Sequence, residues 1–213
     1  MINTIIYDLD GTIVNTKKSI IKSFNLAFKK NKIKTINESF FKKNANRGSE
    51  YLIKQRLNKD NIYLLKKINK DFHKFYKINC TKNISCKKGV KFFLSKYKKK
   101  YTHIICTNKN TLYANKILQK LKIKNYFSYV IGSDFSPYKK PSINLFKKIK
   151  SKKIQKEIIL IGDSEIDFKF ANNSNLKFIL LENGYTNKKK NEISNGFHIN
   201  NFYKLQKIIS LFN

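Results

Sequence analysis

The stretch Tyr7-Asp8-Leu9-Asp10-Gly11-Thr12 ends an apolar run with two carboxylates and a turn signal. We interpret residues 4–8 as a buried strand, along which alternation places the side chains of Asp8 and Asp10 on the same side. Gly11 then allows the chain to turn. Two such carboxylates can share a divalent metal, or one can attack an electrophile while the other moves a proton. Asp-Gly by itself is more typical of a plain turn, so the remaining sequence must separate the two interpretations.

From residue 86 onward, helical and strand-like segments alternate, which predicts an α/β fold with a parallel sheet and crossover helices. Apolar runs predict strands at 103–107, 129–132, 158–161 and 178–181. The run Ile158-Ile159-Leu160-Ile161 is typical of a strand covered on both faces. The intervening patterns predict helices at 89–99, 112–121, 142–150, 165–171 and 202–212.

The block between the first strand and this alternating region has only helical patterns. Apolar spacing predicts an amphipathic helix over 17–30, with Asn15 or Thr16 as its cap. Residues 37–79 continue the helical pattern, and Gly48 interrupts it so that Ser49 starts a new helix. An all-helical insertion is therefore expected after the first strand.

Polar residues follow three of the predicted strands at the sheet edge where open parallel sheets bind ligands. They are Asp8 and Asp10 after the first strand, Thr107 and Asn108 after the second, and Asp163 and Asp167 after the third. Asp163 and Asp167 are four residues apart at a helix start and can reach the same metal. Four of the seven aspartates fall in these motifs although the chain is poor in acids, which favours a metal site over chance.

With these motifs the chain resembles phosphatases of the haloacid dehalogenase superfamily, in the phosphoglycolate phosphatase-like branch. The four motifs of that family are matched in order and spacing by Asp8-Leu9-Asp10-Gly11-Thr12, Thr107, Lys140 with Pro141, and Gly162-Asp163-Ser164 through Asp167. The resemblance covers essentially the whole chain. It implies a Rossmann-like catalytic core of residues 1–15 and 82–213, with a helical C1-type cap domain of residues 16–81.

The resemblance also implies a magnesium-dependent phosphoryl transfer through an aspartyl-phosphate. Asp8 is then the nucleophile, and Asp10 protonates the leaving alkoxide and later deprotonates water. Mg2+ would be held by Asp8, by the backbone carbonyl of Asp10, by Asp163 and, through water, by Asp167. Phosphate oxygens would be held by Thr107, Asn108 and Lys140.

Several of these residues have plainer interpretations. Lys140 is one of many lysines and, taken alone, is typical of a solvated surface cation, with Lys139 as a possible substitute for it. Thr107 and Asn108 are also typical strand-end capping residues. Asp134 could join the metal site, but a turn role after Gly132 is favoured. In the family an Asp is common where this chain has Asn15.

Arg47 is informative because only two arginines occur in the chain, and it lies in a segment similar to the family's substrate-facing loop. We hypothesise that Arg47 reaches from the cap to a second anionic or hydroxyl-rich part of the substrate. An ordinary surface arginine near a helix start is an equally good interpretation.

The 213 residues include 46 basic and 13 acidic ones, which gives a net charge of +33. Such a charge alone suggests nucleic acid or another acidic partner. The basic residues are spread along the chain, however, and nearly all are lysine, which lacks the arginine fork that reads bases and phosphates. We favour compositional bias toward Lys, Asn and Ile, and keep nucleic-acid binding as the alternative.

Other features point to a reduced protein without a membrane anchor. The three cysteines are odd in number and lack metal-ligand spacing. Neither a basic leader nor an apolar run of membrane-spanning length is evident, so we expect a cytoplasmic protein, as a monomer or homodimer.

The function expected is hydrolysis of a small phosphorylated metabolite such as phosphoglycolate or a sugar phosphate. Two alternatives use the same motifs: a phosphomutase of the β-phosphoglucomutase type, and a nucleotide or polynucleotide phosphatase that exploits the basic surface.

Overall fold

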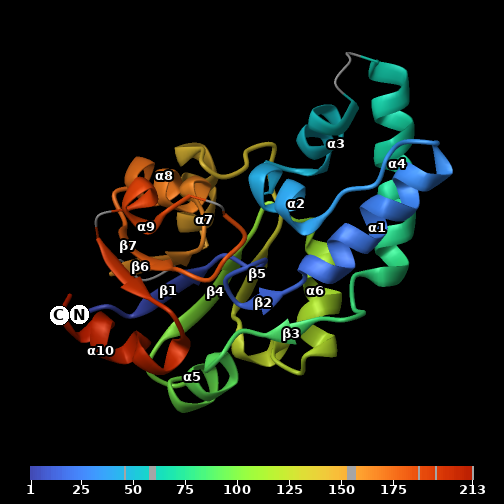
Figure 1. Cartoon of the computed structure of the whole chain (residues 1–213). Coiled ribbons are helices and arrows are strands. Elements are labelled where there is room, and N and C mark those ends of the chain that lie inside the picture. The colour runs from blue at the N-terminus through green and yellow to red at the C-terminus, as the bar shows by residue number, and fades with distance from the viewer. Residues whose placement is uncertain (46, 58–60, 153–156, 187, 195, 213) are drawn as a thin grey trace.

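A computed structural model describes residues 1–45, 47–57, 61–152, 157–186, 188–194 and 196–212. At its centre lies a six-stranded sheet in the order β5-β4-β1-β6-β7-β8 (Figure 1). Every neighbouring pair in this sheet is parallel. The strands are β1 (Thr4–Tyr7), β4 (Thr102–Cys106), β5 (Tyr129–Ile131), β6 (Ile158–Gly162), β7 (Lys177–Leu181) and β8 (Phe197–Ile199).

The first strand, β1, occupies the centre because both of its faces are apolar and covered. Ile5 and Tyr7 face one hydrophobic core, whereas Ile6 faces the other. The chain leaves β1 toward β4 on one side and reaches β6 on the other. The direction of winding therefore reverses at β1, which is where doubly wound sheets place their ligand crevice.

Helices cover both faces of the sheet (Figure 1). One core contains side chains of α5 (Val90–Lys96), α6 (Thr111–Lys120) and α10 (Leu205–Ser210), and the other contains side chains of α7 (Ile143–Lys150), α8 (Glu165–Asn173) and α9 (Lys190–Ile193). Two short 3-10 helices, η1 (Lys124–Tyr126) and η2 (Phe202–Lys204), complete these layers. This arrangement confirms the α/β fold class and the parallel sheet.

Four consecutive helices lie together on one side of the sheet, away from the two chain ends (Figure 1). They are α1 (Lys17–Lys30), α2 (Glu38–Asn44), α3 (Ser49–Leu57) and α4 (Ile62–Asn79). Helices α1 and α4 pack through aromatic rings, with Phe24 stacked on Phe72 at a centroid distance of 4.0 Å. The buried carboxylate of Asp71 on α4 also accepts hydrogen bonds from Lys30 and Asn31.

A short antiparallel pair, β2 (Val14–Asn15) and β3 (Ser85–Cys86), joins the two ends of this helical block. We did not predict this pair, because two-residue strands leave no periodic signal. Strand β8, with three residues, and helix α9, with four, were not predicted either. The closing helix expected over 202–212 is divided into η2 and α10. The division into a core and a cap at residues 16–81 stays a prediction.

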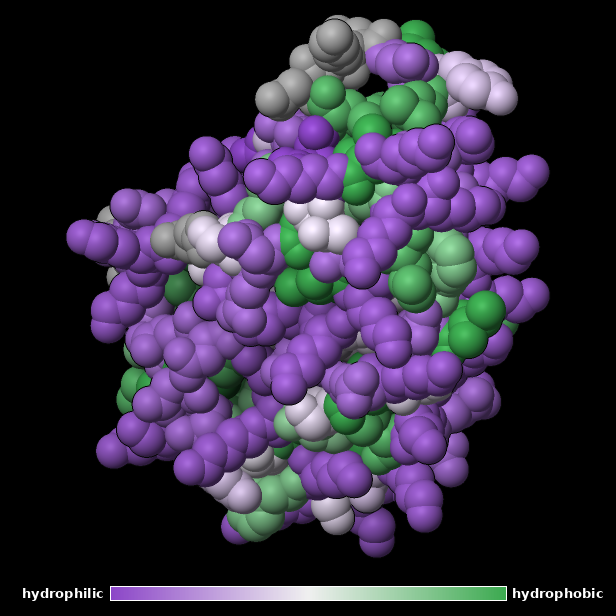
Figure 2. All heavy atoms as spheres, turned by 45° about the vertical axis from the view of Figure 1, so that its right-hand side comes forward, coloured by the Kyte–Doolittle hydropathy of each residue, from purple (hydrophilic) through white to green (hydrophobic). Residues whose placement is uncertain are grey.

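Hydrophilic side chains cover most of the face shown in Figure 2, as the abundance of lysine requires. Among the described helices, none combines the length and apolar character needed to cross a membrane.

Candidate active site

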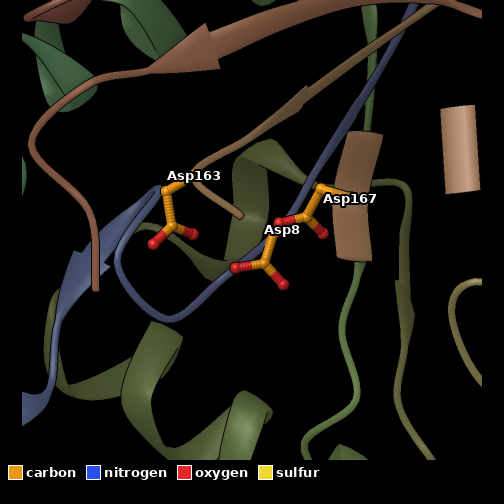
Figure 3. Close-up of side chains that lie close together, drawn as sticks. All are labelled: Asp8, Asp163 and Asp167. Carbon is orange, nitrogen blue, oxygen red and sulfur yellow. The ribbon is translucent and has the colours of Figure 1, made fainter. Parts of the chain in front are cut away.

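Three buried carboxylates from two separate parts of the sequence meet at the carboxyl edge of the sheet. Asp8 follows β1, Asp163 follows β6, and Asp167 lies in the first turn of α8. One carboxylate oxygen from each lies within 4.8 Å of the other two. Figure 3 shows the three carboxyl groups gathered around a common space. The structure thus brings together three of the four residues that we expected to hold a metal.

The turn after β1 fits closely around Asp163. Gly11 has a φ of +91°, and a Cβ atom added there would lie 2.3 Å from Asp163 Oδ2. A Cβ atom on Gly184 would lie 2.1 Å from the same oxygen. Backbone therefore approaches this carboxylate on two sides where no other residue type has room.

Hydrogen bonds fix Asp163 within this enclosure. Thr12 Oγ1 donates to Oδ1 at 2.9 Å, and the backbone N–H of Tyr185 donates to Oδ2 at 2.7 Å. Asp167 is fixed locally by a capping box at the start of α8, in which its Oδ2 accepts from the Ser164 N–H at 3.2 Å and its own N–H donates to Ser164 Oγ at 3.4 Å. Ser164 Oγ also donates to Asp167 Oδ2 at 2.6 Å.

Lys140 is buried between two of the carboxylates. Its Nζ lies 2.7 Å from Asp8 Oδ1 and 2.6 Å from Asp167 Oδ1. The side chain is only 3% exposed, so the interpretation of Lys140 as a solvated surface lysine is wrong. Lys139, the possible substitute, is exposed at the rim of the adjoining cavity.

Asn108 positions the backbone of Lys140. Asn108 Nδ2 donates to the Lys140 carbonyl at 3.1 Å, and the Lys140 N–H donates to Asn108 Oδ1 at 3.0 Å. Both ends of the Asn108 amide are therefore engaged with the loop that carries the buried ammonium. This gives Asn108 a supporting role that we did not foresee.

The cluster holds more negative charge than Lys140 alone can balance, since three carboxylates face one ammonium. Burial raises the pKa of Asp8 well above its usual range, although the ammonium of Lys140 opposes this. Burial, and next the charge of Asp167, raise the pKa of Asp163 to about 7. An added divalent cation would remove this imbalance, and carboxylate oxygens are the ligands that Mg2+ prefers. The donor set therefore fits a magnesium ion.

Asp10 lies beside this cluster and has other partners. Thr16 Oγ1 donates to Asp10 Oδ1, and Lys109 Nζ lies 3.0 Å from Asp10 Oδ2. The Asp10 side chain therefore has partners outside the cluster of Asp8, Asp163 and Asp167. That its backbone carbonyl reaches a metal stays a prediction. Lys109 was missed by the sequence reasoning, because one lysine among so many carries no signal beyond its place next to Asn108.

A cavity of about 390 Å3 adjoins these residues and extends to the helical block. Thr107, at the end of β4, lines it and accepts a hydrogen bond from the backbone N–H of Lys109 at 3.2 Å. Residues from α3 and α4 and the loop before α3 line the opposite side, including Arg47, Glu50, His73 and Tyr76. The cavity therefore joins the carboxylate cluster to the helical block.

Arg47 lines this cavity but contacts its own segment. Its Nη1 donates to Tyr51 Oη at 3.1 Å, and its guanidinium carbon lies 5.0 Å from the centre of that ring. The structure thus places Arg47 within the cavity wall without joining it to the carboxylate cluster.

Two further residues take structural positions near the site. Asp134 lies in a turn that the Phe135 N–H closes by donating to the Gly132 carbonyl at 3.1 Å, and its carboxylate accepts hydrogen bonds from the N–H and hydroxyl of Thr111, the first residue of α6, at 2.7 and 2.8 Å. Asn15 accepts a hydrogen bond from Tyr185 Oη at 3.2 Å. Tyr185 consequently links Asp163 to the segment that leads into α1, a role that sequence patterns do not reveal.

Known proteins resemble this chain in sequence. The model of the haloacid dehalogenase-like hydrolase family matches residues 5–181. A phosphoglycolate phosphatase from Rhodobacter capsulatus is 29% identical over 105 residues, which cover 49% of this chain and 48% of the relative. The match therefore spans about half the length of this curated relative.

Solved structures share the fold over nearly the whole chain. A predicted phosphoglycolate phosphatase from Haemophilus somnus superposes with a TM-score of 0.89 at 24% identity and covers 98% of both chains. A mutant of CbbY from Rhodobacter sphaeroides in complex with xylulose-(1,5)bisphosphate has a TM-score of 0.79 at 15% identity and covers 96% of both. Together with the family match, the site geometry shows that this chain belongs to the haloacid dehalogenase-like hydrolase family.

Proposed function

We propose that the protein is a magnesium-dependent phosphatase that hydrolyses a small phosphate monoester through an aspartyl-phosphate on Asp8. The observation that carries this proposal is the buried cluster of Asp8, Asp163 and Asp167, with the Lys140 ammonium between two of its members. A carboxylate nucleophile and a phosphate dianion repel each other, so the site needs fixed positive charge around both. The surplus of carboxylates over ammonium groups provides a place for that charge.

Magnesium would be held by Asp8, the backbone carbonyl of Asp10, Asp163 and, through water, Asp167, and it would neutralise phosphate and carboxylate charge. Asp8 forms a bond from its carboxylate oxygen to phosphorus while the bond from phosphorus to the leaving oxygen breaks. Lys140, supported by Asn108, and the hydroxyl of Thr107 hold the other phosphate oxygens.

Asp10 carries the proton in both halves of the reaction. It gives its proton to the leaving oxygen, which departs as an alcohol. It then takes a proton from the water that attacks the acyl-phosphate, so that Asp8, inorganic phosphate and protonated Asp10 are restored. The different environments of Asp8 and Asp10 support this separation of roles.

The cavity supports a small substrate. Its volume of about 390 Å3 suits a metabolite of a few carbon atoms, and Arg47 in its wall would meet a second anionic or hydroxyl-rich group. The curated relative from Rhodobacter capsulatus is a phosphoglycolate phosphatase, which supports phosphoglycolate or a small sugar phosphate. We further propose that residues 16–81 form the cap, and that the enzyme works in the cytoplasm as a monomer or homodimer.

The test is phosphate release from a panel of phosphomonoesters with and without magnesium, run beside Asp8→Asn. We expect activity that needs the metal and that disappears in the variant. Full activity in Asp8→Asn would remove Asp8 as the nucleophile. Isomerised phosphate in place of free phosphate would favour a mutase, and a preference for polynucleotide ends would favour a nucleic-acid substrate.

Arg47→Ala tests the proposed substrate contact. We expect a raised KM for substrates with a second anionic group and unchanged affinity for magnesium. An identical kinetic profile across all substrates would remove Arg47 from the substrate site.

A further inference from the structure

A buried lysine connects the proposed proton-transfer residue with the helical block. Lys109 follows β4, and its side chain is only 9% exposed. Its Nζ lies 3.0 Å from Asp10 Oδ2 and donates to Tyr76 Oη at 2.6 Å. Tyr76 belongs to α4, so a single ammonium joins a residue of the sheet edge to a helix of the insertion.

The neighbours of Lys109 maintain its charge despite burial. Burial lowers the pKa of this ammonium, but the Asp10 carboxylate and the Tyr76 oxygen outweigh that effect and raise it above its ordinary value. Tyr76 stays a neutral phenol, because burial raises its pKa to about 12. Nζ also lies 4.5 Å from the centre of the Tyr76 ring, a distance at which a cation is attracted to the ring.

The contact fixes one end of the Asp10 carboxylate, and Thr16 fixes the other. Thr16 donates to Oδ1, while Lys109 meets Oδ2, so both oxygens have defined partners. Tyr76 is itself held, since its ring stacks on Phe72 and meets Tyr113 edge-on. The position of Asp10 is therefore tied to the packing of α4.

We propose that Lys109 is a positioning residue for proton transfer by Asp10, and that it couples the Asp10 carboxylate to Tyr76 and hence to the seating of α4. The inference rests on the proposed function, because it concerns how Asp10 delivers its proton to the leaving oxygen. Lys109 acts through Asp10 and forms no bond to the substrate.

Leaving groups of different basicity separate this role from substrate binding. An alkyl phosphate releases an alkoxide that needs a proton, whereas p-nitrophenyl phosphate releases a stable phenolate that does not. A well-placed general acid contributes about 10²–10⁴-fold, so losing its alignment should cost part of that factor. The ratio kcat/KM covers only the steps through formation of the aspartyl-phosphate, so it leaves out the later deprotonation of water by Asp10, which both substrates share. For Lys109→Met we expect kcat/KM to fall about 30-fold on the alkyl phosphate and less than about 3-fold on p-nitrophenyl phosphate.

A double-mutant cycle tests whether Lys109 acts through Asp10. Adding Lys109→Met to Asp10→Asn should cause no further loss on the alkyl phosphate, because the residue it positions is already disabled. Tyr76→Phe, which keeps the ring and removes only the hydroxyl, should show a smaller loss with the same leaving-group pattern. Lys120→Met, an exposed lysine at the end of α6, is the matched control for charge and should behave as wild type.

Equal losses of kcat/KM on both substrates, or additive losses of kcat/KM in the double variant, would overturn the inference. If Lys109→Met fails to fold, as judged by its thermal unfolding, Tyr76→Phe and the cycle of Tyr76→Phe with Asp10→Asn decide the question. If no ester releases phosphate from the wild type, the proposed function fails. If phosphate is released and Asp8→Asn abolishes it while the Lys109 pattern is absent, only this inference fails.

Discussion

Asp163→Asn should make the metal-free protein more stable toward unfolding. The variant removes one of three buried carboxylates whose oxygens lie within 4.8 Å of each other. Two like charges at that distance repel by about 3 kcal/mol at an effective dielectric constant of about 20. Asparagine can keep both contacts, because its oxygen can accept from the Tyr185 N–H while its amide donates to Thr12 Oγ1, which becomes the acceptor where it now donates. We therefore expect the variant to be more stable than wild type by roughly 3 kcal/mol at about pH 8 in EDTA.

The stability of metal-free wild type should fall as the pH rises. The folded-state pKa of Asp163 is raised to about 7, so the folded protein binds more protons than the unfolded chain between about pH 4 and 7. Wild type without metal therefore loses stability as the pH rises through that window, by up to about 4 kcal/mol from this group. The advantage of Asp163→Asn should be largest above about pH 7 and should nearly vanish at about pH 4.

The assay is urea unfolding at several pH values, with EDTA and with magnesium. Magnesium at about 100 times its dissociation constant should add about 2.7 kcal/mol to wild type and almost nothing to the variant. Asp134→Asn is the matched control, because it removes an aspartate that lies outside the cluster and accepts a hydrogen bond from the first residue of α6. A variant that is less stable than wild type in EDTA at about pH 8 would refute the argument from like charges.

Three further outcomes are expected. Lys140→Met leaves Asp8 and Asp167 without their buried cation. Its free energy of unfolding in urea without metal should be about 3–5 kcal/mol lower than that of wild type, and it should have no phosphatase activity with metal. A variant as stable as wild type would contradict the ion-pair geometry. Gly11→Ala places a Cβ atom against Asp163 and should reduce the magnesium affinity measured by isothermal titration. The control is Gly48→Ala, at a φ of +88° with no atom within 4 Å, which should leave that affinity unchanged. Equal affinities of the two variants would show that the turn at Gly11 shifts to accommodate the added atom. Burial lowers the pKa of His103 to about 4. As the pH falls from about 6.5 to 4, the free energy of unfolding of wild type should therefore fall by up to about 3 kcal/mol relative to that of His103→Gln. The same pH dependence of the unfolding free energy in both proteins would show that His103 does not contribute.

Local patterns were sufficient for the long elements of the fold. The helix over 17–30 begins and ends as its apolar spacing predicts, and the run over 158–161 becomes a central strand because it is covered on both faces. The two-residue strands β2 and β3 were not predicted, since so few residues show no periodicity. The three-residue strand β8 was not predicted either, whereas β5, of the same length, was predicted over 129–132 from its apolar run.

What the sequence by itself determined is the identity of the acidic motifs, because acids are scarce in this chain and four of seven aspartates stand where predicted strands end. Only the tertiary structure decided which lysine pairs with which aspartate. Lys140 meets Asp8 and Asp167, whereas Lys109 meets Asp10, and neither pairing can be read from a chain so rich in lysine. The physical reason is burial: an ammonium becomes specific only where folding removes it from water and leaves particular carboxylates as its partners.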